Sequence, residues 1–320
     1  MSNELTFSIF ELQQKIKTED DARHYLEARR WEYGKACPRC GDEKKQYTLS
    51  RKGYHKCGEC KLTYTVRTGT IFERSHMSLT KWLFAIYFVL TARKGISSIQ
   101  LSKHLGVNQR TAWSILHKIR EAMNEGLAFL PKLKGTVEID ETYVGGKETN
   151  KHASKKLHSG RGTVGKIPVI GIKERGGYVY ADVVKHANME TAEAQIDYNV
   201  ADDAEVMTDE SVIYKNVSNK RTHHRVNHSA KQYVDGKAST NGIESVWAIL
   251  KRMFYGIYHK FTMKHLQRYV NECTFRLNEG NCKINLWERF EALLWGGFQK
   301  RMTYAELIGD VVEEPITATW

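Results

Sequence analysis

Residues 135–147, GTVEIDETYVGGK, alternate apolar and polar side chains and end at a pair of glycines. This period of two predicts a half-buried β-strand that enters a turn, with Glu138, Asp140 and Thr142 on one face. A carboxylate on a strand is costly to bury unless a cation or a hydrogen-bond donor meets it. Asp140 is therefore either part of a solvated sheet face or a ligand of a bound cation.

Two later acidic residues stand in contexts that match Asp140. Residues 204–209, AEVMTD, predict a short strand that ends at Asp209, and residues 239–252 predict a capped helix with Glu244 in its early turns. Phosphodiester chemistry with two divalent ions needs hard oxygen ligands that converge from separate elements. These three carboxylates are thus candidate ligands for a pair of Mg²⁺ or Mn²⁺ ions.

The composition indicates a folded protein with a polyanionic partner. The chain has 320 residues, of which 41% are hydrophobic, enough for two or three domains. Lys and Arg number 49 against 37 Asp and Glu, and the net charge of +12 favours nucleic acid over a membrane surface. Residues 1–20 lack a signal-peptide pattern, and the longest apolar run, residues 82–90, is about half of a membrane span. We expect a cytoplasmic protein without membrane contact.

Four of the six cysteines form two CxxC pairs separated by sixteen residues. The spacing C-x2-C-x16-C-x2-C is typical of a zinc ribbon, in which four thiolates hold one tetrahedral ion. Without a secretory signal, the pattern favours metal over disulfides. We expect one structural Zn²⁺ on Cys37, Cys40, Cys57 and Cys60. Basic residues around them favour a nucleic-acid contact over a purely structural role.

Residues 97–120 follow the helix-turn-helix pattern. A first helix ends at Gly106, Asn108 can cap a second helix, and polar side chains line one face of that second helix. The pattern also occurs in ordinary helical bundles, but in a basic chain after a zinc ribbon it favours DNA recognition. The expected contact residues are Gln109, Arg110, Ser114 and Lys118.

Residues 145–166 are rich in Gly, Lys and His and predict a long loop after the first strand of the third domain. The loop is interpreted both as a solvated hairpin tip and as an arm that contacts phosphates, and the two interpretations are compatible. The candidate DNA contacts in it are Lys147, Lys155, Lys156 and Arg161.

The third domain has the element order of a ribonuclease H-like fold. A strand, a hairpin at residues 168–184, a helix at 189–198, a strand and a closing helix follow one another. The first and fourth strands of that fold are neighbours, which would bring Asp140 next to Asp209. We therefore expect a multidomain α+β protein with a zinc ribbon, a helix-turn-helix and a ribonuclease H-like α/β catalytic domain with a mixed sheet. The expected parts are a helical lead-in (1–33), the ribbon (34–75), the helical DNA-binding domain (76–130), the catalytic domain (135–300) and a C-terminal tail (301–320).

The chain resembles the DDE transposases of bacterial insertion sequences, specifically the ISXO-like group with an N-terminal zinc ribbon. The resemblance runs from about residue 30 to about residue 280. It is carried by CPRCG at 37–41, RTGTIF at 67–72, LTKW at 79–82, EIDETYVGGK at 138–147, TD at 208–209, NHS at 227–229, TNGIES at 240–245, LKR at 250–252 and GIYH at 256–259.

The resemblance implies that Asp140, Asp209 and Glu244 form a metal-binding catalytic triad. Lys251 and Asn241 lie on the same helix face as Glu244, where a cation can hold the DNA strand under attack. Some family members carry Asn in place of the Glu, so Asn241 is a competitor for the third position as well as a candidate DNA contact.

Arg252 is a further expected DNA contact, and His228 is an accessory residue that orients a ligand or a phosphate, unless it is structural. The resemblance implies a transposase that binds terminal inverted repeats, cleaves the 3′ ends of the element and joins them to target DNA. It would act with two Mg²⁺ or Mn²⁺ ions, as a homodimer or larger assembly on DNA. The alternatives are a zinc-ribbon regulator without catalysis, a nuclease of the same fold without strand transfer, and an inactive transposase.

Overall fold

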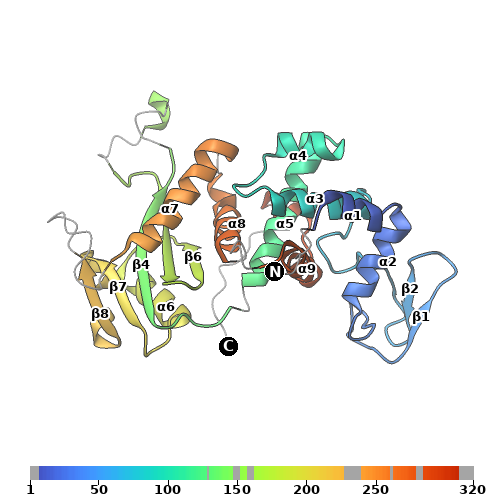
Figure 1. Cartoon of the computed structure of the whole chain (residues 1–320), viewed down its shortest axis with the longest axis horizontal. Helices are drawn as coiled ribbons and strands as arrows, with labels where there is room; N and C mark the ends of the chain where they lie inside the picture. Colours follow the sequence, from blue (N-terminus) through green and yellow to red (C-terminus); the bar gives the residue numbers. More distant parts are fainter. Residues whose placement is uncertain are drawn as a thin grey trace, which may run out of the picture. The chain divides into compact units, whose positions relative to one another are not determined.

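The computed structural model describes residues 7–127, 130–146, 152–156, 162–226, 239–259, 262–278 and 284–309. The chain divides into two compact units (Figure 1). The first contains residues 1–128 together with 282–320, and the second contains residues 129–281. Within the described residues, no helix is both long and apolar enough to cross a membrane.

The first unit begins with two short helices and a small sheet. Helices α1 (Ile9–Lys15) and α2 (Glu19–Arg30) both start at capping boxes, where Ser8 and Thr18 accept backbone hydrogen bonds from the third helical residue. Strands β1 (Gln46–Thr48), β2 (His55–Cys57) and β3 (Thr63–Tyr64) form an antiparallel sheet in that order.

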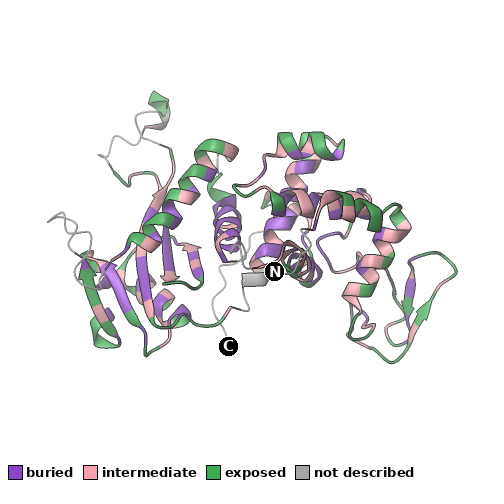
Figure 2. Cartoon of the chain, in the orientation of Figure 1, coloured by how far each residue is buried: buried purple, intermediate pink, exposed green. Residues whose placement is uncertain are grey.

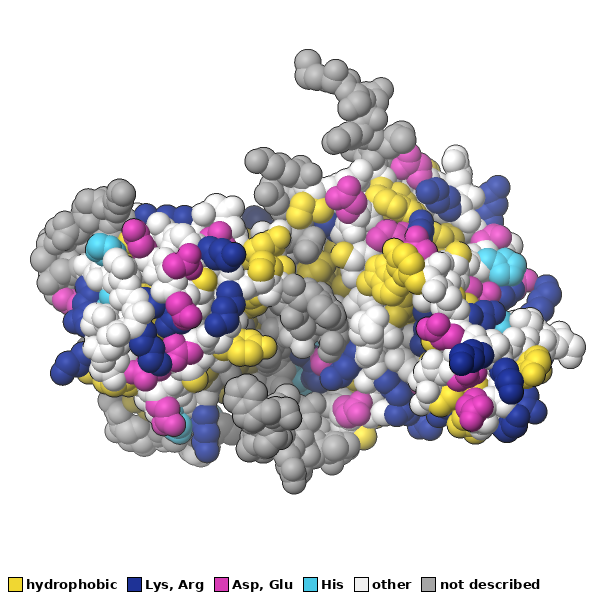
Figure 3. Space-filling view, turned by 90° about the horizontal axis from the view of Figure 1, so that it is seen from below, with side chains coloured by type: hydrophobic (Ala, Val, Ile, Leu, Met, Phe, Trp, Pro, Cys, Tyr) yellow, Lys and Arg dark blue, Asp and Glu magenta, His cyan; other side chains and the backbone are white. Residues whose placement is uncertain are grey.

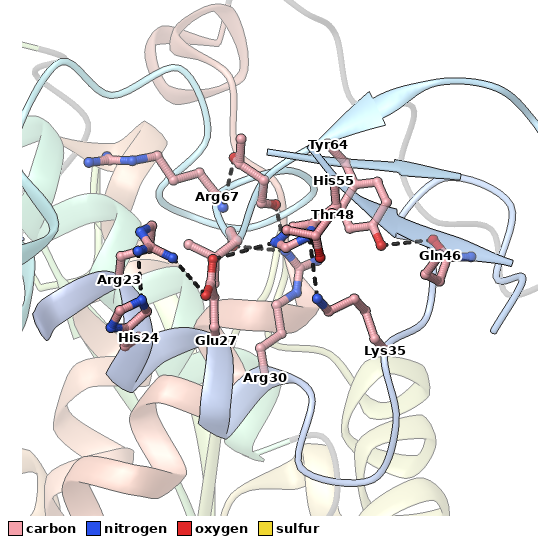
Figure 4. A network of polar contacts seen from close by, with 12 residues as sticks. Arg23, His24, Glu27, Arg30, Lys35, Gln46, Thr48, His55, Tyr64 and Arg67 are labelled. Carbon is pink, nitrogen blue, oxygen red and sulfur yellow. Dashed lines mark hydrogen bonds and ion pairs between the residues drawn. The ribbon is translucent and has the colours of Figure 1, made fainter. Parts of the chain in front are cut away.

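Helix α2 packs against this sheet through a buried polar network (Figure 4). The His55 ring lies edge-on to Trp31, with 5.0 Å between ring centroids, and its Nε2 lies 3.5 Å from Oε1 of Glu27. Arg30 donates to the carbonyl oxygen of Val66 at 2.8 Å. The second helix of the expected lead-in is therefore packed onto the ribbon.

Three further helices build the core of the first unit. Helix α3 (Leu79–Thr91) contains the long apolar run and is largely buried. Helices α4 (Ser98–Leu105) and α5 (Gln109–Leu127) are joined by a tight turn in which Gly106 has a φ of 59°, and Asn108 accepts a hydrogen bond from the Thr111 N–H at 2.8 Å. The two helices and the glycine turn thus lie where the helix-turn-helix pattern predicts them.

Helix α9 (Leu286–Gln299) falls within residues 135–300, the range expected for the catalytic domain. In the structure it belongs to the first unit instead. A Cβ added at Gly296 would lie 2.1 Å from the carbonyl oxygen of Ala122, so the glycine lets α9 approach α5 closely. Ile71 also donates its N–H to the Gly297 carbonyl oxygen at 3.0 Å. A short helix, α10 (Tyr304–Ile308), follows within the residues assigned to the tail and buries Leu307.

The second unit contains a mixed sheet in the order β6-β5-β4-β7-β8. Strand β4 (Thr136–Val144) is antiparallel to β5 (Ile167–Glu174), which is antiparallel to β6 (Val179–Val183). On its other side β4 is parallel to β7 (Glu205–Asp209), and β7 is parallel to β8 (Thr222–Val226). The first and fourth strands of this unit, β4 and β7, are neighbours, as they are in a ribonuclease H-like fold. The edge strand β8 is an addition to the predicted elements.

Helices cover both faces of this sheet. Helix α6 (Met189–Asn199) packs on one face with Val137, Ile139 and Val206. Helices α7 (Asn241–Met253) and α8 (Leu266–Asn278) pack on the other, where Cys273 is buried, as the helical periodicity predicts. Figure 2 shows buried residues along β4 and exposed ones along the outer side of α7.

Candidate active site

Asp140 and Asp209 lie at matching positions of two neighbouring parallel strands, Asp140 in the middle of β4 and Asp209 at the end of β7. The β4–β7 pairing sets Glu138 opposite Met207, and two more residues along each strand lead to the two aspartates. Side chains two residues apart on a strand share a face, so both aspartates lie on the face that α7 covers. Residues 69 positions apart are thereby brought together, as the predicted strand order requires.

The carboxylate of Asp140 is held by the helix above it. The indole N–H of Trp247 donates to Oδ2 of Asp140 at 2.9 Å. Burial raises the pKa of Asp140 to about 7, the negative charges of Glu141 and Asp209 add to the shift, and the Trp247 hydrogen bond opposes it. A divalent cation is the counter-ion that such oxygen ligands bind, so the donor set suits a metal.

Glu244, the third candidate ligand, lies in the first turn of α7. It is exposed, and its Oε1 accepts a hydrogen bond from the Thr240 hydroxyl at 3.2 Å. Within the described ranges, the ligand atoms of the four zinc-ribbon cysteines form the one metal-type cluster with all members within 4.8 Å. Glu244 and the two aspartates are therefore not drawn together to that distance.

Glu138 holds the start of the helix that carries Glu244, a role that sequence reasoning missed. It is 3% exposed, accepts the Ile243 N–H at 2.9 Å and pairs with Arg175 at 2.8 Å. A Cβ at Gly242 would lie 2.5 Å from Oε2 of Glu138, so glycine is needed there for this approach. The alternation of the strand already put Glu138 on the Asp140 face, which was the available signal.

Glu141 is a second acidic residue that the sequence interpretation passed over. Strand alternation turns it toward the α6 face, where the Tyr214 hydroxyl donates to its Oε2 at 2.7 Å. Burial raises the pKa of Glu141; the Tyr214 hydrogen bond opposes this shift, and the charge of Asp209 adds to it. Its charge adds to the negative potential around Asp140.

The three residues of α7 that are candidate DNA contacts, Lys251, Asn241 and Arg252, lie on its exposed side. Lys251 lines a small cavity of about 50 Å³ with Thr142 and Tyr255, and Thr142 follows Asp140 by two residues on the same strand face. Asn241 and Arg252 are exposed on the same helix. Lys251 therefore lies near the carboxyl end of β4, a few residues beyond Asp140 on the strand.

The candidate contacts of the helix-turn-helix separate into exposed and buried residues. Gln109 and Arg110 are exposed, and Ser114 is half-buried. Lys118 is only 8% exposed, and its ammonium donates to the carbonyl oxygens of Ile71 at 3.1 Å and Glu73 at 3.3 Å. The expectation that Lys118 lies on the open face of the helix is therefore wrong, because the Ile71–Glu73 backbone covers it.

The basic loop after β4 is described only in part. Lys156 is half-buried, next to the short 3₁₀ turn Ala153–Lys155. Lys147, Arg161 and His228 lie outside the described residues, as does the side chain of Lys155.

The four ribbon cysteines meet the geometry of a zinc site. The Sγ atoms of Cys37 and Cys60 lie 3.7 Å apart, and those of Cys40 and Cys57 lie 3.6 Å apart. Four thiolates at a Zn–S distance of about 2.3 Å in a tetrahedron have sulfurs about 3.8 Å apart. The donor set and its spacing therefore fit one structural Zn²⁺.

Strand order, helix placement and the two aspartates on adjacent strands define a ribonuclease H-like domain with an acidic site on β4 and β7. Family models agree: residues 132–278 match the ISXO2-like transposase domain, and residues 17–63 match the transposase zinc-ribbon domain. A protein in the transposable element ISH50 of Halobacterium salinarum is 30% identical over 257 residues, which cover 74% of this chain and 84% of the relative. The chain belongs to the ISXO2-like transposase family of insertion sequences.

Solved structures with some likeness include a simian T-cell lymphotropic virus intasome in complex with PP2A regulatory subunit B56 gamma. It has a TM-score of 0.29 and 13% identity, with 74% of this chain and 78% of that chain covered. The Mos1 strand transfer complex has a TM-score of 0.22 and 12% identity, with coverage of 69% and 79%. At these TM-scores the assignment rests on the family models and the sheet topology.

Proposed function

We propose that the chain is a DDE transposase that cleaves the 3′ ends of its element and transfers them to target DNA with two divalent metal ions. The observation that carries the proposal is the pair Asp140 and Asp209 on adjacent parallel strands, with the pKa of Asp140 raised to about 7 by burial and nearby carboxylates. Two carboxylates in such surroundings favour a bound cation.

The proposed ligands of the metal ions are Asp140, Asp209 and Glu244. When bound, the ions would lower the pKa of the attacking water or 3′-hydroxyl and would stabilise the charge on the leaving oxygen. To share an ion with the two aspartates, the Glu244 side chain, which is exposed in the first turn of α7, would turn toward them. Glu138 and Trp247 keep α7 and Asp140 in place during that movement.

The chemistry proceeds in two displacements at phosphorus. In the first, water forms a bond to the phosphorus at the element end, the bond to O3′ breaks, and the proton lost by water is balanced by one gained at O3′. In the second, the freed 3′-hydroxyl loses its proton and attacks a phosphorus of target DNA, and the target O3′ leaves and gains a proton. Lys251, near the carboxyl end of β4, would neutralise the phosphate under attack.

DNA is the proposed partner, with a homodimer or larger assembly forming on it. Figure 3 shows Lys and Arg side chains scattered among acidic and neutral ones on the face it displays. A net charge of +12 supports capture of any DNA sequence. Selection of the element ends would then depend on local base contacts such as that of Gln109.

Strand transfer on a labelled duplex carrying a candidate element end tests the proposal. Wild type should yield joined products with Mg²⁺ and none with EDTA, and Asp140→Asn should bind DNA but yield no product. Asp203→Asn is the matched control, because Asp203 is exposed and precedes the amino end of β7, the opposite end from Asp209. Cleavage without joining would indicate a nuclease, and binding without metal-dependent chemistry would indicate a regulator.

A further inference from the structure

A cavity of about 500 Å³ lies in the first unit beside the amino-terminal half of α5. Its walls come from three segments far apart in the sequence: residues 73–82, the α5 residues 110–118 and residues 301–305. All three segments belong to the same compact unit. The cavity therefore joins the second helix of the helix-turn-helix to the segment that follows α9.

The lining of the cavity is rich in positively charged side chains. Arg74, Arg110, Lys118 and Arg301 line it, and Glu73 is the acidic residue in its lining. The rest of the lining mixes the hydroxyl side chains of Ser75, Thr111, Ser114, Thr303 and Tyr304 with apolar side chains such as Trp82 and Met302, which are 1% and 4% exposed. Cations in a hollow with partly apolar walls focus the electric field and attract an anion.

Two of these cations are held in fixed positions by their neighbours. Arg301 Nε pairs with Oε1 of Glu73 at 3.1 Å, and Arg110 donates to the Tyr304 hydroxyl and lies 5.5 Å from the centroid of its ring. A guanidinium has five N–H donors, so each of these contacts leaves donors for a ligand. Pre-positioned guanidinium groups suit the oxygens of a phosphate.

The two remaining cations also face the cavity at some cost. Burial lowers the pKa of Lys118, and an anion in the cavity would oppose that effect. Arg74 has a φ of 54°, in the left-handed region that favours glycine. A strained residue that lines a cation-rich cavity is a common mark of a ligand site.

We propose that this cavity binds a backbone phosphate of DNA, with Arg74, Arg110 and Arg301 as donors. The segment Arg301–Ala305 then forms part of the DNA-binding surface together with the helix-turn-helix. This inference rests on the DNA-binding part of the proposed function but not on its chemistry. It is therefore tested by binding alone, without added divalent metal.

Fluorescence anisotropy of an element-end duplex and of a scrambled duplex, at several salt concentrations, tests this site. Arg301→Gln and Arg74→Gln should each weaken both duplexes by about tenfold and reduce the salt slope by about one. The ratio of the two affinities should stay unchanged, because a phosphate contact carries no sequence information. Asp140→Asn should lose strand transfer but bind both duplexes as the wild type does. That result would show that this site and the catalytic site act independently.

Arg29→Gln is the matched control for Arg301→Gln. Arg29 Nε pairs with Oε2 of Glu291 at 3.1 Å, and Arg301 Nε pairs with a Glu73 carboxylate oxygen at the same distance. Both arginines belong to the first unit. Arg29 does not line the cavity. Arg29→Gln should leave the DNA affinity and its salt slope at the wild-type values. If both variants weaken binding equally, the effect is structural and the proposal is wrong.

Tyr304→Phe and inorganic phosphate complete the test. Loss of the hydroxyl that holds Arg110 should weaken DNA binding by about threefold. Tighter DNA binding by Tyr304→Phe would instead mean that Tyr304 covers Arg110, which overturns the proposal. Arg301→Lys keeps the positive charge and should restore much of the salt slope lost in Arg301→Gln. Calorimetry in which inorganic phosphate binds as tightly as the duplex would also overturn it, because the site would then serve a free anion.

Discussion

The indole N–H of Trp247 donates a hydrogen bond to Oδ2 of Asp140 at 2.9 Å. The two residues come from a helix and a strand 107 positions apart. Gly171 lies opposite Asp140 in the β5 partner strand, and a Cβ there would lie 2.4 Å from the Trp247 ring. The absence of a side chain at Gly171 thus lets the indole lie on the sheet beside the carboxylate.

Trp247→Phe should weaken metal binding more than it weakens the fold. Phe keeps an aromatic ring over Gly171 but has no N–H, so Oδ2 of Asp140 loses the donor that orients it. We expect the Mg²⁺ concentration for half-maximal strand transfer to rise by about tenfold, with a smaller change in the rate at saturating metal. Trp295→Phe, in the first unit, is the control and should leave the metal dependence unchanged. An identical shift in both variants would argue against an orienting role.

Gly171→Ala should destabilise the second unit and abolish activity. The added Cβ would lie 2.4 Å and 2.9 Å from atoms of Trp247 and Ile243, so α7 must move away from the sheet. Such overpacking costs about 1–3 kcal/mol, which thermal or urea unfolding would detect. A Cβ at Gly256 meets nothing within 4 Å, and Gly256→Ala should therefore unfold like the wild type. Wild-type stability of Gly171→Ala would contradict the close packing of the indole.

Asp140→Asn should stabilise the metal-free protein at alkaline pH. The pKa of Asp140 is raised to about 7, above its value of about 3.9 in an unfolded chain. The folded protein therefore binds more protons between these values, and its stability is fully present below pH 4 and falls as the pH rises through 7. Asn carries no charge and avoids this loss, so its advantage at pH 8 is on the order of 4 kcal/mol.

Unfolding of both proteins across this pH range, with and without Mn²⁺, measures the effect. Metal at tenfold excess over its dissociation constant should stabilise the wild type by about 1.4 kcal/mol and Asp140→Asn by much less. Asp203→Asn should behave as the wild type does, because Asp203 is exposed. Equal stability of wild type and Asp140→Asn at pH 8 would mean that Asp140 is not a strained carboxylate.

Cys57→Ser should remove the zinc and unfold the ribbon. The thiol belongs to the group of four whose sulfurs lie within 4.8 Å of one another, and a structural zinc supplies about 10 kcal/mol of folding free energy in small domains. Metal analysis should give one Zn²⁺ per wild-type chain and little in the variant, with faster proteolysis of residues 37–66. Cys273→Ser is the control, because Cys273 is buried within α8 in the second unit and its replacement should not change the zinc content.

Local patterns in the sequence predicted the elements and most of the candidate site. Alternation at residues 136–144 predicts β4, the CxxC spacing predicts the zinc ligands, and Gly106 with Asn108 predicts the turn between α4 and α5. These features depend on residues close together in the chain, where periodicity and capping act. The order of the elements then predicted that Asp140 and Asp209 become neighbours, because few topologies are open to such an order.

Contacts between distant segments were decided only by the tertiary structure. The Trp247–Asp140 hydrogen bond, the Glu138 contact with the start of α7 and the burial of Lys118 each join residues that no local pattern relates. The placement of α9 in the first unit has the same origin, because it depends on the close packing of Gly296 against Ala122 of α5. Sequence periodicity determines which face of a helix or strand is buried, whereas shape complementarity in the folded chain determines what that face meets.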